Sequence, residues 1–197
     1  MRSCTRSLMY PISVSKHYVH EENRKRKMSF AVISSYLTPV SKYAIHSAHE
    51  HGMLTGGWTL CATNEEAKVM RNKYNLLAEL RISMCSVTSA ATQTIDVADG
   101  VLAFRLAQSH TTDCTIGYAL TGEWKPHTFM THTPYKPTLV IRSIAEPVHV
   151  IRSIMEWLAL HNISILNVVA PPMEPEASRI TCAIINTLFV AIADSWK

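Results

Sequence analysis

The fold can be read outward from residues 30–39, Phe30-Ala31-Val32-Ile33-Ser34-Ser35-Tyr36-Leu37-Thr38-Pro39. The continuous apolar run 30–33 is typical of a strand that is buried on both faces. Thr38 and Pro39 are residue types preferred at the N-cap and in the first turn of a helix. That helix is predicted to run to His51, with Gly52 as its stop. The domain therefore opens with a strand, a short turn and a helix.

Short apolar runs continue to alternate with helical patterns along the rest of the chain. Further strands are predicted at 101–104, 138–141 and 163–169. Further helices are predicted from 63 onward, at 87–98, at 115–124, from 147 onward and at 179–193, with Ser178 capping the last. This alternation indicates βαβ units with right-handed crossovers. We expect an α/β protein, a three-layer Rossmann-like domain with a mainly parallel sheet, whose last helix is well covered.

In such sheets, ligands bind outside the carboxyl ends of the strands. The loops at 34–38, 105–117, 142–147 and 170–178 are therefore the places where a site is expected.

Composition restricts the classes of protein that fit. The chain has 197 residues, enough for one domain, and 47% of them are hydrophobic, enough for a full core. No apolar stretch approaches the roughly 18 residues of a membrane span, so no membrane association is expected. Residues 1–27 hold seven of the 19 basic residues and two of the 15 acidic ones, which leaves 12 and 13 in the remainder. Because the remainder has no basic surplus, nucleic acid is not an expected partner.

The domain is expected to span 28–197, after a disordered basic extension at 1–27 that has no apolar signal-peptide core. Met28 directly precedes the first strand and is an alternative start, in which case residues 1–27 are not translated. The five cysteines are odd in number and form no CxxC motif. They fit reduced thiols in a cytoplasmic protein better than a disulfide framework.

Several segments carry a resemblance to a known family. They are Thr55-Gly56-Gly57-Trp58, Tyr74-Asn75-Leu76, Asp99–Phe104, Lys136–Ile141 and Trp157-Leu158 through Ile165–Pro171. In these the chain resembles the putative molybdenum carrier proteins, a Rossmann-like family distantly related to the cytokinin-activating phosphoribohydrolases. The resemblance implies a nucleotide or an oxyanion as ligand.

The segments that face the ligand in that family have diverged here. The family's Ser-Gly-Gly-Gln-Thr-Gly-x-Asp-Arg turn corresponds to Ser34–Lys42, which keeps Ser34 and Thr38 but none of the three glycines. Its Gly-Thr-x-Leu-Thr element corresponds to Gly117–Thr121, and its Gly-Pro-Arg segment to residues 170–172 without the arginine. Of an acidic pair before the strand at 101–104, only Asp99 remains.

The resulting hypothesis is a divergent member of this family that binds a small anionic ligand or nucleotide without clear catalysis. The predicted ligand-binding residues are Ser34, Ser35, Thr38, Lys42, Asp99, Gly117, Thr121 and Pro171. One alternative is a non-enzymatic protein-interaction module, with the old pocket filled by Tyr36 and Tyr118. Another is a residual nucleotide N-glycosidase or hydrolase. Assembly into a homo-oligomer stays open.

Other reactive residue types give no further site. His46 and His49 have a spacing that a metal could use, but His51 points elsewhere and no third ligand adjoins them, so a surface cluster is expected. No base is paired with Cys114 in the sequence, which favours an idle thiol. His110, His127 and His132 are expected in solvated loops, and Glu123 and Glu146 belong to no paired carboxylate motif. No metal site and no catalytic residue are predicted.

Overall fold

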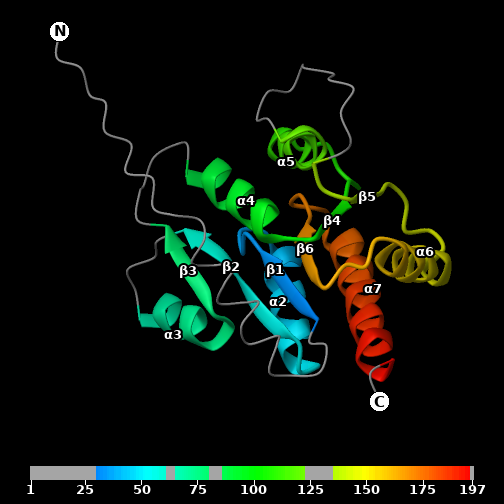
Figure 1. Ribbon diagram of the computed structural model, residues 1–197, viewed down its shortest axis with the longest axis horizontal. Coiled ribbons are helices and arrows are strands. Elements are labelled where there is room, and N and C mark those ends of the chain that lie inside the picture. Colours follow the sequence, from blue (N-terminus) through cyan, green and yellow to red (C-terminus); the bar gives the residue numbers. More distant parts are fainter. Residues whose placement is uncertain (1–29, 61–64, 80–85, 123–134, 196–197) are drawn as a thin grey trace, which may run out of the picture.

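The structure is a computed structural model that describes residues 30–60, 65–79, 86–122 and 135–195 (Figure 1). The expected extension at 1–27 lies outside these residues, as do Glu123, His127 and His132. The predictions made for them therefore stay predictions.

Six strands form one sheet in which every neighbouring pair is parallel, in the order β3-β2-β1-β6-β4-β5. The strands are β1 (Ala31–Ser34), β2 (Leu54–Leu60), β3 (Leu76–Glu79), β4 (Gly100–Phe104), β5 (Thr138–Ile141) and β6 (Ile165–Val169). Strands β1, β4, β5 and β6 confirm the sequence prediction closely.

Strands β2 and β3 are not predicted, because the pair Gly56-Gly57 looks like a turn. The structure shows why glycine stands there instead. Gly57 has φ 130° and lies so close to the end of β1 that a Cβ atom would be 2.0 Å from the Ser34 carbonyl oxygen. Glycine lets β2 pair tightly with the last residue of β1.

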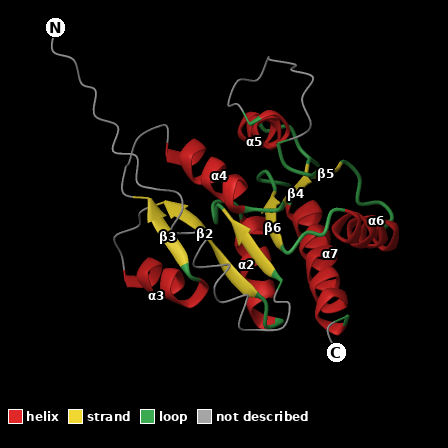
Figure 2. Ribbon diagram, in the orientation of Figure 1, coloured by secondary structure: helices red, strands yellow, loops and turns green. Residues whose placement is uncertain are grey.

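The helices are α2 (Pro39–Glu50), α3 (Glu65–Tyr74), α4 (Ser86–Val97), α5 (His110–Thr121), α6 (Pro147–Leu160) and α7 (Pro175–Asp194). Helices α4 and α5 cover one face of the sheet, and α2, α3, α6 and α7 cover the other (Figures 1 and 2). The predicted three-layer α/β fold with a parallel sheet is confirmed. Strand β6 lies between β1 and β4. From β1 the chain adds β2 and β3 on one side of the sheet, and it then crosses over to add β4 and β5 on the other side.

Two helices begin earlier than predicted. Helix α5 begins at His110 rather than 115, because the Ser109 hydroxyl accepts a hydrogen bond from the Thr112 N–H and caps the helix. Gly122, in the left-handed conformation at φ 72°, ends it. Helix α7 begins at Pro175, which has the fixed φ suited to a first turn, so Ser178 is inside the helix and is not its cap.

The interior is unequal on the two faces. The face under α2, α6 and α7 has a large continuous core that includes Val32, Ile45, Leu102, Ile154 and Phe189. The face under α4 and α5 has two separate small clusters among the described residues. One contains Ala31, Ile33, Val97, Ala98 and Ile165, and the other contains Ile95, Val101 and Ala119.

Helix α7 is long and apolar enough, by length and composition, to cross a membrane, but core helices of soluble proteins pass the same test. Leu188 and Phe189 of α7 are fully buried in this fold. The helix is less covered than the sequence suggests, since Val190 is 38% exposed. The expected cytoplasmic location stays a prediction.

Candidate functional site

The turn from β1 into α2 is the central segment at the carboxyl edge, the edge of the sheet where the strands end. Tyr36 lies in this turn at φ 49°, in the left-handed region that bulky residues rarely adopt. Thr38 and Ser41 form a capping box: Thr38 Oγ1 accepts from the Ser41 N–H at 3.2 Å, and Ser41 Oγ accepts from the Thr38 N–H at 2.9 Å. The predicted N-cap at Thr38 is confirmed.

Two of the residues predicted to bind a ligand in this turn already have structural partners. Ser34 is fully buried, and its hydroxyl donates to the Val168 carbonyl oxygen of β6 at 3.0 Å. It therefore joins β1 to β6, and Thr38 is occupied as the cap of α2. Ser35 is half-buried, and Lys42 is exposed in the first turns of α2.

The ring of Tyr36 leans toward α3. Its centroid lies 6.2 Å from that of Tyr74, the last residue of α3, and Lys42 Nζ lies 5.6 Å from the Tyr36 centroid. Burial and the neighbouring Tyr74 raise the pKa of the Tyr36 hydroxyl. Lys42 forms no ion pair with a carboxylate among the residues that the structure describes.

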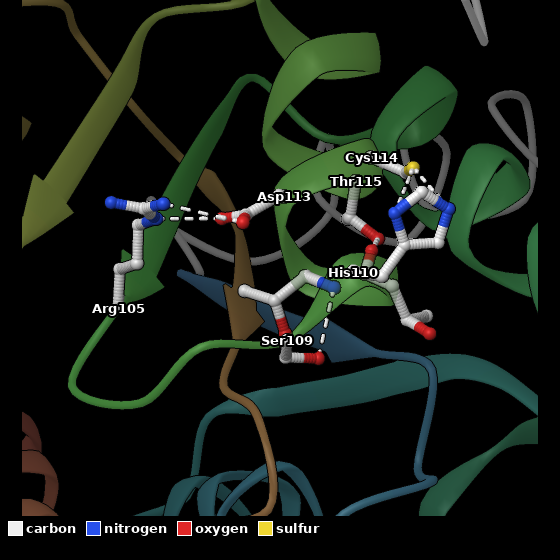
Figure 3. Close-up of polar contacts among 8 residues, drawn as sticks. Arg105, Ser109, His110, Asp113, Cys114 and Thr115 are labelled. Atoms are coloured by element: carbon white, nitrogen blue, oxygen red, sulfur yellow. Dashed lines mark hydrogen bonds and ion pairs between the residues drawn. The ribbon is translucent and has the colours of Figure 1, made fainter. Parts of the chain in front are cut away.

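The β4–α5 connection brings a second polar group to the carboxyl edge (Figure 3). Arg105, directly after β4, donates from Nε to Asp113 Oδ1 at 2.6 Å and from a terminal nitrogen to Oδ2 at 3.2 Å. The hydrogen bond and charge of Arg105 lower the pKa of Asp113. His110 lies over Cys114, with Nε2 3.6 Å from Sγ. The thiol that the sequence leaves unpaired thus has an imidazole partner one helical turn away, and His110 belongs to a helix rather than to a loop.

The end of β6 adjoins the β1–α2 turn. Pro171 is buried two residues after the end of β6, at the carboxyl edge, and its predicted role in ligand binding stays a prediction. A cleft of about 320 Å³ opens farther along this edge, between the end of β5 and the start of α6. It is lined in part by Arg142, Ser143, Glu146, His149 and Ser153. None of the predicted ligand residues lines this cleft.

Three predicted ligand residues do not reach the carboxyl edge. Asp99 precedes β4 and lies at the amino edge, where the strands begin. Its Oδ2 accepts from the Ser164 N–H and hydroxyl and from the Ile165 N–H, at 2.7–3.2 Å, which fixes the start of β6 beside β4. Gly117 lies within helix α5, and Thr121 at its end bonds back to the Gly117 carbonyl oxygen at 2.8 Å. Residues 117–121 are therefore the second half of a helix rather than a phosphate-binding loop.

Tyr118 also lies away from the β1–α2 turn, near the amino edge. Its hydroxyl and that of Tyr135 both donate to Asp96 Oδ1, at 2.8 and 2.9 Å. Burial and the bond to Asp96 raise the pKa of Tyr118 strongly and that of Tyr135 to about 12. Tyr36 and Tyr118 consequently cannot fill one common pocket.

The helix α2 histidines have protein partners. His46 hydrogen-bonds the Tyr74 hydroxyl at 2.7 Å and pairs with Glu50 at 3.1 Å, and the His49 ring stands edge-on to Tyr74. His51 bonds Asn186 of α7 at 3.1 Å. Among the described residues, no group of three or more His, Cys, Asp or Glu side chains could hold a metal ion.

Sequence reasoning missed one buried residue in the central strand. Asn167 of β6 is 1% exposed and is paired in register with Ile33 of β1 and Val101 of β4. Among the residues that the structure describes, its side-chain oxygen has no hydrogen-bond partner. The available signal was a polar residue inside the apolar run 163–169.

Comparison with known proteins supports the architecture. No protein-family model and no curated protein matches the chain. A solved structure, described as a putative molybdenum carrier protein from Syntrophus aciditrophicus SB, superposes with a TM-score of 0.63 and 18% sequence identity, over 83% of this chain and 96% of that one. At this identity the likeness shows the fold. The resemblance inferred from the sequence is confirmed at that level.

Proposed function

We propose that the protein binds a small anionic ligand or nucleotide at the carboxyl edge of the sheet, around the β1–α2 turn. We further propose that it is a divergent member of the molybdenum carrier family without clear catalysis. The name of the structural neighbour points to a molybdenum ligand for that protein. For this chain, the proposal depends on the geometry of its own turn.

The observation that carries the proposal is the left-handed conformation of Tyr36. A residue with a side chain is disfavoured there by about 1–2 kcal/mol, and such strain clusters at ligand-binding turns. Tyr36 stands where the resembling family has glycine, so the conformation that glycine allows is kept although the glycine is not. The turn leads into a capped helix start beside β6, where the direction of strand addition changes, a place where such sheets bind ligands.

The electrostatics of this turn favour an anion. The amino end of α2 carries partial positive charge, and its first turn contains no acidic residue. Lys42 adds an ammonium group that no described carboxylate neutralises. Because the Tyr36 ring leans toward α3 and Tyr118 lies near the other edge, the two tyrosines that the interaction-module alternative needs as a plug do not meet.

Binding can be tested by thermal unfolding and calorimetry with sulfate, molybdate and adenosine monophosphate. A ligand at about 100 times its Kd should stabilise the fold by about 2.7 kcal/mol, which corresponds to roughly 5–11 °C. Lys42→Ala should weaken binding about tenfold, or about 1.4 kcal/mol. Lys73→Ala is the matched control, because its ammonium also lies over a tyrosine ring, 5.1 Å from the Tyr74 centroid, but on α3.

The absence of any anion-induced shift would overturn the proposal and favour an interaction module. Equal losses of ligand affinity in the Lys42→Ala and Lys73→Ala variants would mean that the site lies away from the β1–α2 turn. Release of free base from the nucleotide would contradict the proposed lack of catalysis.

A further inference from the structure

The Asn167 side chain poses a hydrogen-bonding problem in the middle of the sheet. Its Nδ2 donates to Thr94 Oγ1 of α4 at 3.4 Å, whereas its Oδ1 has no partner within the described part of the chain. Among the residues that the structure describes, it is the single buried side-chain polar atom in this state. Buried polar groups are nearly always paired, so an orphaned one points to something that joins the site.

The neighbouring hydroxyl determines which end of the amide is free. Thr94 has one hydroxyl hydrogen, and it is donated to the Ala91 carbonyl oxygen at 2.8 Å. Thr94 Oγ1 can therefore only accept from Asn167, which requires the Nδ2 end of the amide. The group left over is an acceptor, and only a donor can satisfy it.

The position of Asn167 connects it with the carboxyl edge. It lies two residues before the end of β6 and pairs with Ile33, the residue before the end of β1. Two residues of a parallel strand span about 7 Å. On the face under α4 and α5, Asn167 lies in β6 between Ile165 of one apolar cluster and Val169, which packs against the other. An apolar side chain there would extend the packing, so a polar one is costly to the free fold.

We propose that Asn167 Oδ1 accepts a hydrogen bond from the ligand, which therefore carries an N–H or O–H donor beside its anionic group. This inference rests on the proposed function and narrows it to a phosphorylated sugar or nucleotide. Molybdate and sulfate have oxygen acceptors only and leave Oδ1 unpaired. A ligand held by its phosphate at the edge must therefore extend a sugar hydroxyl or a base amino group about 7 Å inward, the span of two strand residues.

The test compares four anions on the wild type and on Asn167→Val: adenosine monophosphate, ribose 5-phosphate, molybdate and sulfate. In the wild type, the two donor-bearing ligands should bind at least tenfold more tightly than molybdate and sulfate. Asn167→Val should abolish that preference while leaving the affinities for molybdate and sulfate unchanged. Ribose 5-phosphate shows whether the sugar alone supplies the donor. Thr94→Ser, which keeps the hydroxyl that fixes the amide orientation and leaves Oδ1 free, is the matched control and should keep the preference.

The stability of the free protein gives a second readout. Because the valine removes an unsatisfied acceptor, the unliganded Asn167→Val chain should melt at or slightly above the wild-type temperature. A clear fall would mean that an internal water already pairs Oδ1, and the inference would be overturned. The Asn167 inference also fails if the anions bind but the valine variant keeps the preference for the nucleotide. In that case the proposed function still stands. If no anion binds, both fail. A valine variant that does not fold counts as such a fall in stability and likewise overturns the inference.

Discussion

Gly57→Ala should be the most damaging small substitution near the candidate site. The added Cβ would lie 2.0 Å from the Ser34 carbonyl oxygen and 2.9 Å from the Ser34 nitrogen, both backbone atoms that cannot rotate away. Its φ of 130° is in a region essentially restricted to glycine, which adds about 1–3 kcal/mol. Relieving the overlap adds a similar amount. The expected loss is about 4 kcal/mol, or roughly 8–16 °C in Tm for a domain of this size.

Gly56→Ala provides the matched control one residue away. A Cβ there would meet Ile33 Cγ2 at 3.6 Å and the Asn75 carbonyl oxygen at 3.8 Å, which are ordinary contacts. We expect it to change stability by no more than about 1 kcal/mol. Both variants are compared by thermal and urea unfolding. A Gly57→Ala chain that melts within about 2 °C of the wild type, or a Gly56→Ala chain that melts equally low, would refute the close approach of β2 to β1.

Three further predictions concern polar groups outside the turn. Asp99→Ala should lower the free energy of unfolding, measured in urea, by about 2 kcal/mol, because Ser164 loses its acceptor. The affinity for anions should stay unchanged. A variant with normal stability but lost anion binding would return Asp99 to the ligand site. Burial raises the pKa of the Cys182 thiol, so its alkylation near neutral pH, followed by peptide mass spectrometry, should be slower than that of a free cysteine. The difference between the two rates should shrink as pH rises. A rate equal to that of the free thiol near neutral pH would contradict this. Arg105 lowers the pKa of Asp113, so their pair stabilises the fold above the unfolded carboxyl pKa and loses this effect as pH falls through the folded one. With both side chains 40% exposed, Arg105→Gln should lower the urea midpoint only slightly at pH 6. The difference should vanish in acid, below the folded pKa of Asp113, and a difference that stays constant with pH would argue against the pair.

The sequence predicts the fold best where the signals are local. An apolar run followed by Thr38-Pro39 is sufficient to predict β1 and α2, since both the N-cap and the first-turn proline act within a few residues. Strand β2 is not recognised in the sequence because its glycine pair resembles a turn, whereas Gly57 serves a close contact with β1 that forms only in the folded sheet. The early start of α5 was available in principle from Ser109, a good N-cap residue.

The site is harder to predict because residue type does not specify which edge of the sheet a residue occupies. Asp99 precedes its strand, and in a parallel sheet that alone places it at the amino edge, opposite Lys42. The family resemblance favoured it as a ligand residue, whereas its hydrogen bonds show a structural role. The contact between His110 and Cys114 follows from their i,i+4 spacing once both are known to be helical.

Two unfavourable features belong to adjacent strands, one at the carboxyl edge of the sheet and one about 7 Å inside it. Tyr36 follows β1 in a strained conformation, and Asn167 of β6 leaves an acceptor unpaired. Together they amount to about 2–5 kcal/mol, which is a large part of the 5–15 kcal/mol that typically stabilises a domain. Glycine in place of Tyr36 and valine in place of Asn167 would remove the backbone strain and the unpaired acceptor. Local conflicts of this kind are expected where a site is prepared for something absent from the free chain. An anion with an N–H or O–H donor, held at the β1–α2 turn, would pair the Asn167 acceptor and would explain why the strained conformation of Tyr36 is kept.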